Sequence, residues 1–148
     1  MRLRTLALGL CSASLLAVAA NAETLTIATV NNGDMVRMQT LTDDFTSKNP
    51  DIQLNWVTLE ENVLRQRVTN DIANKGGQFD VLTIGTYEVP IWAKNQWLLP
   101  LDGLGADYDV ADIIPAIAGG LTVDGKLYAA PFYGASSMVM YRKDLIGS

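Results

Sequence analysis

The sequence predicts an α/β protein built on an open, mostly parallel sheet with helices on both faces. Segments of strand character alternate with segments of helical periodicity, so the order over residues 24–85 is βαβαβ. The run FDVLTIG at residues 79–85 is nearly all apolar, as in strands that are buried on both faces of a parallel sheet. Right-handed crossovers between parallel strands then place helices on both sides.

The first strand and the first helix are expected directly after residue 23. Residues 24–30, TLTIATV, are rich in β-branched side chains, and NNGD after them supplies turn residues. From Met35 onward, Met38, Leu41 and Phe45 recur at helical spacing until KNPD breaks the pattern. These residues predict strand, loop and helix.

The second strand is expected at residues 52–59, IQLNWVTL, where apolar and polar residues alternate. A charged helix is expected from residue 60, with its apolar residues on one face, and the glycine pair at 76–77 ends it. Residues 79–85 are expected to form the third strand.

The remaining elements are shorter. Residues 110–120, VADIIPAIAGG, predict a helix closed by glycines, and Asp124-Gly125 is a hairpin signal between two apolar stretches. Residues 136–143, SSMVMYRK, are predicted to form one more strand, and Asp144 is placed to begin a helix after it.

Residues 1–22 have the features of a secretory signal peptide: two early arginines, an apolar run, and the small residues Ala20 and Ala22 before the cleavage point. The alternative, a membrane-spanning helix, is disfavoured because the apolar run is short and contains serines. Cys11 lies within this segment. We expect a periplasmic chain that starts at Glu23 and is not inserted in the membrane.

Composition narrows the chemistry of the exported part. Histidine is absent from the sequence and the single cysteine lies in the leader, which excludes disulfides, thiol or histidine catalysis, and thiolate or imidazole metal sites. Two of the eleven basic residues lie in the leader, so its removal takes the net charge from −5 to −7. This balance argues against nucleic acid as a partner. We expect no metal, no cofactor, and a small or neutral ligand.

Ligands of open parallel sheets bind beyond the carboxyl ends of the strands. The loops expected there are NNGDM at residues 31–35, GTYEVPIW at 85–92 and APFYGASS at 130–137.

Three segments carry a resemblance to a known family: ETLTIATVNNGD, GGQFDVLTIGTYEVPIWAKNQWLLPLD and VDGKLYAAPFYGASSMVMYRKDL. Together they resemble the extracellular solute-binding proteins of ABC importers, in the maltose-binding-protein-like group, and NNGDMVRMQTLTDDF and PFYG look closest to the sorbitol and mannitol binders. The resemblance implies a two-lobed receptor that closes on a sugar or sugar alcohol and presents it to the membrane subunits of an ABC permease.

The resemblance also implies the domain organisation. Residues 1–22 would be the signal peptide and 23–135 the N-terminal lobe, a periplasmic-binding-protein-like α/β unit. Residues 136–148 would be the first crossover strand and the start of a second lobe, most of which is absent from the sequence.

A polyol offers hydroxyls and an apolar carbon face, so its site needs carboxylates, amides and aromatic rings. Asp34 is similar in position to a sugar-binding aspartate of the family, but it could instead only cap the helix at Met35. Asn31 or Asn32 could add an amide.

The other candidates lie in the second and third loops. Tyr87 or Glu88 could contact the ligand, although Glu88 could equally be the solvated first turn of a helix that contains Pro90. Trp92 could contact the ligand or pack in the core. Phe132 and Tyr133 follow a proline and are stacking candidates, with a core role as the alternative. The binding candidates are Asn32, Asp34, Tyr87, Glu88, Trp92, Phe132 and Tyr133.

One position departs from the family pattern. Relatives commonly place a sugar-binding glutamate where this sequence has Ala135, and the loss of that acceptor removes on the order of 1.5 to 3 kcal/mol. A truncated, non-functional relic of such a receptor is therefore an alternative to a working one.

An enzyme is the second alternative. An exported glycosidase needs a pair of carboxylates, and the sequence offers several candidates. They are Asp34, Glu60, Glu61, Glu88 and Asp102. Because acidic residues are frequent on solvated surfaces, we expect a binding protein and not an enzyme.

Overall fold

The structure is a computed structural model, and it describes residues 22–135 and 138–146. The predicted signal peptide therefore lies outside the described residues, apart from Ala22. The core is a parallel three-stranded sheet in the order β2-β1-β3, with strands β1 (Glu23–Val30), β2 (Ile52–Leu59) and β3 (Val81–Leu82). The predicted parallel α/β architecture is confirmed.

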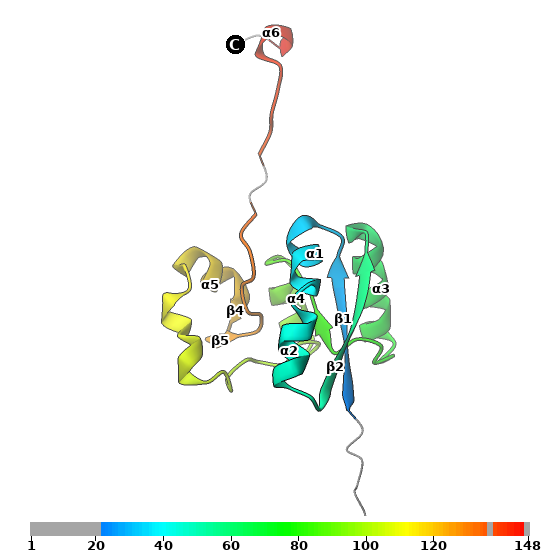
Figure 1. The fold of residues 1–148 in the computed structure, drawn as a ribbon. Coiled ribbons are helices and arrows are strands. Elements are labelled where there is room, and N and C mark those ends of the chain that lie inside the picture. Colours follow the sequence, from blue (N-terminus) through cyan, green and yellow to red (C-terminus); the bar gives the residue numbers. More distant parts are fainter. Residues whose placement is uncertain (1–21, 136–137, 147–148) are drawn as a thin grey trace, which may run out of the picture.

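The two faces of the sheet have different partners. On one face Ala28 packs with Leu64 and Val68 of α3 (Glu61–Ala73) and with Trp92 of α4 (Val89–Lys94). On the other face the Trp56 indole donates a hydrogen bond of 2.9 Å to the Thr42 hydroxyl at the start of α2 (Thr42–Lys48). Figure 1 shows α3 and α2 on opposite sides of β1 and β2. Successive side chains along a strand point to opposite faces of the sheet, so the strands contribute to one packed layer on each face.

The helix expected from Met35 is instead two helices, α1 (Gly33–Gln39) and α2. The Thr40 hydroxyl donates a hydrogen bond to the Arg37 carbonyl, and the Thr42 hydroxyl donates one to the Gln39 carbonyl; each bond is 2.7 Å long. Such side-chain bonds compete with the hydrogen bonds of the helical backbone. The first helix therefore ends at Gln39, although the helical spacing of apolar residues continues to Phe45.

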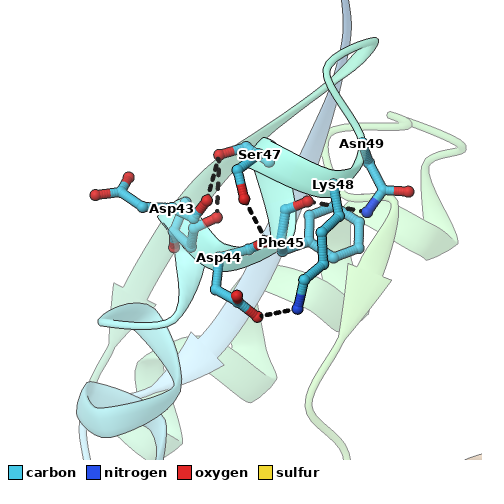
Figure 2. Close-up of polar contacts among 8 residues, drawn as sticks. Asp43, Asp44, Phe45, Ser47, Lys48 and Asn49 are labelled. Atoms are coloured by element: carbon cyan, nitrogen blue, oxygen red, sulfur yellow. Dashed lines mark hydrogen bonds and ion pairs between the residues drawn. The ribbon is translucent and has the colours of Figure 1, made fainter.

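The second of these helices is closed by its own side chains (Figure 2). The Asn49 amide donates to the Phe45 carbonyl over 2.9 Å, and Lys48 pairs with Asp44 at 2.9 Å. The Asn49 side chain thus adds a donor to a carbonyl in the last turn of α2, and the Lys48–Asp44 pair links two side chains one turn apart.

The third strand is shorter than expected. Only Val81 and Leu82 pair as a strand, next to Ile27 and Ala28 of β1, although Thr83 continues with a backbone bond of 3.0 Å to the Ala28 carbonyl. The chain then turns toward α4, which brings residues 83–88 to the carboxyl edge of the sheet.

A smaller region follows the sheet. It contains the 3₁₀ turns η1 (Ala106–Tyr108) and η2 (Val110–Asp112), the helix α5 (Pro115–Leu121) and the antiparallel pair β4 (Thr122–Val123) and β5 (Lys126–Leu127). The hairpin predicted at Asp124-Gly125 is confirmed, with φ values of 49° and 78° at the two turn residues. Positive φ at both positions is the geometry of a tight hairpin turn.

The prediction of a strand at residues 136–143 is wrong for the residues of this segment that the structure describes. Residues 138–142 have no regular secondary structure, and α6 (Lys143–Ile146) follows them. Met138, Val139 and Met140 are 75%, 88% and 86% exposed. A strand needs a neighbour that takes up its backbone hydrogen bonds, and the described residues offer none at this place. The helix expected near Asp144 is present.

Candidate functional site

The three strands are parallel, so their carboxyl ends meet at one edge of the sheet. Asn31 and Asn32 follow β1, Glu60 follows β2, and residues 83–88 follow β3. The Asn31 amide donates to the Leu59 carbonyl over 3.0 Å, which ties the first loop to the neighbouring strand. This edge is where open α/β sheets place their ligands.

Asn32 joins the first loop to the third. Its Oδ1 accepts a hydrogen bond of 2.9 Å from the Met35 amide, which makes Asn32 the N-cap of α1. Its Nδ2 donates over 2.8 Å to the hydroxyl of Tyr133. One side chain therefore fixes the start of a helix and the position of a distant aromatic ring.

Asp34 does not have the capping role that the sequence left open for it. Because α1 begins at Gly33, the cap is Asn32, and Asp34 stands in the first turn. Its side chain is exposed. A carboxylate there is favoured by the positive end of the helix dipole and remains available to a ligand.

A cavity of about 210 Å³ brings the first and third loops together. Its lining comprises an acid, a base, two aliphatic side chains and two rings: Asp34, Arg37, Met38, Leu41, Phe132 and Tyr133. The two rings pack edge to face, with centroids 5.7 Å apart and an angle of 78° between them. Phe132 is 50% and Tyr133 42% exposed, so the core alternative for these rings is wrong. The mixture suits a small molecule with hydroxyls and an apolar carbon face.

Tyr87 and Glu88 form a second group at the same edge. The Tyr87 side chain is exposed, whereas Glu88 is buried and accepts a hydrogen bond of 2.6 Å from the Gly85 amide. The other oxygen of the Glu88 carboxylate forms an ion pair with Arg65 of α3. Glu88 is thus not the solvated first turn expected as an alternative, because it is buried and each of its carboxylate oxygens already has a partner.

Arg65 was not among the residues that the sequence singled out. It also bonds Glu61, one turn earlier in α3, and its guanidinium carbon lies 4.8 Å from the centre of the Tyr87 ring. Burial by itself lowers the pKa of Arg65, but hydrogen bonds to Glu88 and Glu61 outweigh it and raise that pKa above its usual range. The only signal in the sequence was the i, i+4 spacing from Glu61, which is common on solvated helices.

Trp92 lies in the hydrophobic core, 5% exposed, with its ring edge to face against Trp97 at 6.2 Å. Of the two roles that the sequence left open for it, the structure supports packing. The predicted site residues therefore separate into three sets. Asp34, Phe132 and Tyr133 line the cavity, and Asn32 is joined to it through its bond to Tyr133. Tyr87 and Glu88 form the group with Arg65, and Trp92 supports the fold.

A larger hollow of about 380 Å³ lies along α3. It is lined largely by amide side chains together with Arg67 and Asp71, and none of the predicted site residues contributes to it. The buried Asp71 Oδ1 atom there has no hydrogen-bond partner among the described residues. It lies against Gly76, because a β-carbon on that glycine would be 2.0 Å away. This oxygen is thus covered by backbone and closed to a ligand.

Residues 31–148 match the family described as bacterial extracellular solute-binding protein. The chain belongs to this family. It is a family of exported binding proteins and not of enzymes, so the glycosidase alternative is not supported.

Two relatives of this solute-binding protein are similar in sequence. A mannitol-binding protein of Pseudomonas aeruginosa is 59% identical over 128 residues, which are 86% of this chain and 29% of the relative. The crystal structure of an ABC transporter solute-binding protein from Agrobacterium vitis, with bound D-mannitol, is 73% identical with a TM-score of 0.76. That match covers 84% of this chain and 30% of the other. The chain therefore spans less than a third of the length of either relative.

A more distant structure agrees on the fold. The sugar-binding protein MalE of Xanthomonas citri is 24% identical with a TM-score of 0.65, over 73% of this chain and 28% of the other. The described part of this solute-binding protein thus has the architecture of the maltose-binding-protein-like group. In this part of the chain, no helix is long and apolar enough to cross a membrane.

Proposed function

We propose that this chain is the substrate-binding component of a periplasmic ABC importer for a sugar alcohol, with D-mannitol as the first ligand to test. The observation that carries the proposal is the cavity in which Asp34, Phe132 and Tyr133 converge from segments about 100 residues apart. The similarity to a mannitol-binding protein and to a mannitol-bound structure supports the choice of ligand.

The proposed roles follow from the chemistry of each group. Asp34 would accept hydrogen bonds from two neighbouring hydroxyls, because an ionised carboxylate has two acceptor oxygens. The rings of Phe132 and Tyr133 would cover the carbon face of the polyol. Asn32 would hold the Tyr133 hydroxyl in place, and Tyr87 would offer a further ring at the same edge.

We propose that residues 23–135 form one lobe of this receptor and that residues 136–148 lead toward a second one. Closure of two lobes around the ligand would then present it to the permease subunits in the membrane. The exposed apolar side chains of Met138, Val139 and Met140 are consistent with a segment that packs against further protein.

The test is calorimetric titration of D-mannitol into the protein recovered from the exported fraction of its own host, after its intact mass has been measured. Saturable binding to D-mannitol, with weaker binding to ribitol and maltose, supports the proposal. The relic alternative, motivated by Ala135, predicts no heat with any polyol, and that result would overturn the proposed function.

A further inference from the structure

Arg65 lies at the carboxyl edge of the sheet and has no role in the proposed binding of the polyol. It extends from α3 to the loop before α4 and contacts three side chains, Glu61, Tyr87 and Glu88. Its own side chain is 27% exposed, that of Glu88 is 9% exposed and that of Glu61 is 60% exposed. The strong partner of the guanidinium is therefore the buried Glu88.

Both ends of this arrangement are fixed. Glu88 is held by the Gly85 amide at 2.6 Å, so its carboxylate does not move with solvent. A guanidinium is planar and has five donors, so it can bond two carboxylates in its plane and leave a flat face free. In this protein that face lies over the Tyr87 ring, with 4.8 Å between the guanidinium carbon and the ring centre.

Tyr87 is held in place although 59% of it is exposed. Arg65 lies on one side of its ring, and Gly85 also lies close to it. A β-carbon added to Gly85 would be 2.8 Å from the ring carbon Cε1 of Tyr87. An exposed tyrosine without such contacts would exchange between rotamers, and a ligand would have to order it on binding. The contacts supply that order in advance.

We infer that Arg65 is a positioning residue, which holds the Tyr87 ring as a preformed surface for the polyol. The inference rests on the proposed function, because Tyr87 is a ligand contact only there. The competing explanation is that Arg65 only neutralises the buried Glu88 and stabilises the fold. The two differ in whether the effect of Arg65 on binding depends on Tyr87.

A double-mutant cycle separates them. Arg65→Lys keeps the positive charge beside Glu88, and with it the fold, but lacks the planar face. We expect this change to raise the Kd for D-mannitol by roughly 3- to 10-fold, the cost of ordering one side chain. In a Tyr87→Leu background the same change should leave Kd unaltered. Equal effects of Arg65→Lys in both backgrounds would overturn the inference while leaving mannitol binding intact.

The matched control is Arg67→Lys. Arg67 lies on the same helix, and its guanidinium lies over an aromatic ring too, that of Phe79 at 5.5 Å. It lines the hollow along α3 and not the carboxyl edge. We expect no change in Kd, so a loss of affinity as large as that of Arg65→Lys would show a general effect of arginine replacement and would contradict the inference.

A readout without ligand keeps the contact testable if the protein binds no polyol. The side-chain protons of Arg65 should show an upfield ring-current shift in NMR spectra, and Tyr87→Leu should abolish it. Absence of this shift in the unaltered protein would overturn the positioning role. If the shift is present but no polyol binds, the proposed function fails while the placement of Tyr87 by Arg65 stands.

Discussion

Asn32 and Tyr133, 101 residues apart in the chain, are joined by a hydrogen bond of 2.8 Å from the Asn32 amide to the Tyr133 hydroxyl. The same asparagine caps α1 through its Oδ1. Replacement can separate the two roles, because serine is a good N-cap but is too short to reach Tyr133. We expect Asn32→Ala to lower the free energy of unfolding by about 1 kcal/mol more than Asn32→Ser does, measured by urea denaturation.

Tyr133→Phe is the control for this comparison, since it removes only the hydroxyl. It should match Asn32→Ser in its loss of stability, about 0.5 to 1.5 kcal/mol for one hydrogen bond. Equal stability of the alanine and serine variants would show that the cap contributes nothing.

Removal of the Glu88 charge should destabilise the protein. Glu88→Gln leaves Arg65 without its buried partner, and we expect the free energy of unfolding to fall by about 2 to 3 kcal/mol. This is below the cost for a fully buried pair because Arg65 is 27% exposed and keeps Glu61. Glu61→Gln, at a side chain that is 60% exposed, should cost less than 1 kcal/mol. Similar losses from the two variants, in thermal or urea unfolding, would contradict this assignment.

Tyr87 makes stability depend on pH in the alkaline range. Partial burial and the nearby Glu88 charge disfavour the phenolate and outweigh the opposing charge of Arg65, so the pKa of Tyr87 is raised above its ordinary value of 10.0. A group whose pKa is higher in the folded state contributes stability that is complete below its unfolded pKa and is lost as the pH rises through the folded pKa. Above pH 10.0 the Tyr87→Phe variant should therefore lose stability less steeply than the unaltered protein. Parallel curves would refute the shift.

Ala135 is exposed and lies two residues after Tyr133. A carboxylate there could accept a hydrogen bond from a polyol held in the cavity. We expect Ala135→Glu to tighten D-mannitol binding by one to two decades, from about 1.5 to 3 kcal/mol of charge-assisted bonding, and Ala135→Gln to gain less. Titration calorimetry measures both, and an unchanged Kd for Ala135→Glu would mean that the position does not face the ligand.

Gly76 is required at the end of α3. A β-carbon there would lie 2.0 Å from the Asp71 Oδ1 atom, while the other oxygen of Asp71 accepts a bond of 2.9 Å from the Gln78 amide. Gly76→Ala should therefore cost about 1 to 3 kcal/mol of stability through overpacking. Gly33→Ala is the matched control, because nothing lies within 4 Å of its added carbon. It should be neutral or slightly stabilising in denaturation, as alanine favours helices.

Local patterns in the sequence predict much of the fold. The second strand was expected at residues 52–59 and lies there, and the hairpin turn was expected at Asp124-Gly125. Both depend on short-range physics, namely alternation and turn conformation. The predicted extent of the first helix was wrong, because side-chain bonds of Thr40 and Thr42 interrupt it. These bonds leave the spacing of the apolar residues unchanged, so the spacing does not reveal the break.

The sequence by itself determined the α/β class, the loops at the carboxyl edge and the kinds of residue that could bind a polyol, because each of these follows from neighbouring residues. Tertiary structure alone decided that Asn32 bonds Tyr133, that Arg65 neutralises Glu88, and that Trp92 is buried. Such contacts join segments distant in sequence, and their free energy comes from burial and charge pairing that arise only when the helices pack on the sheet.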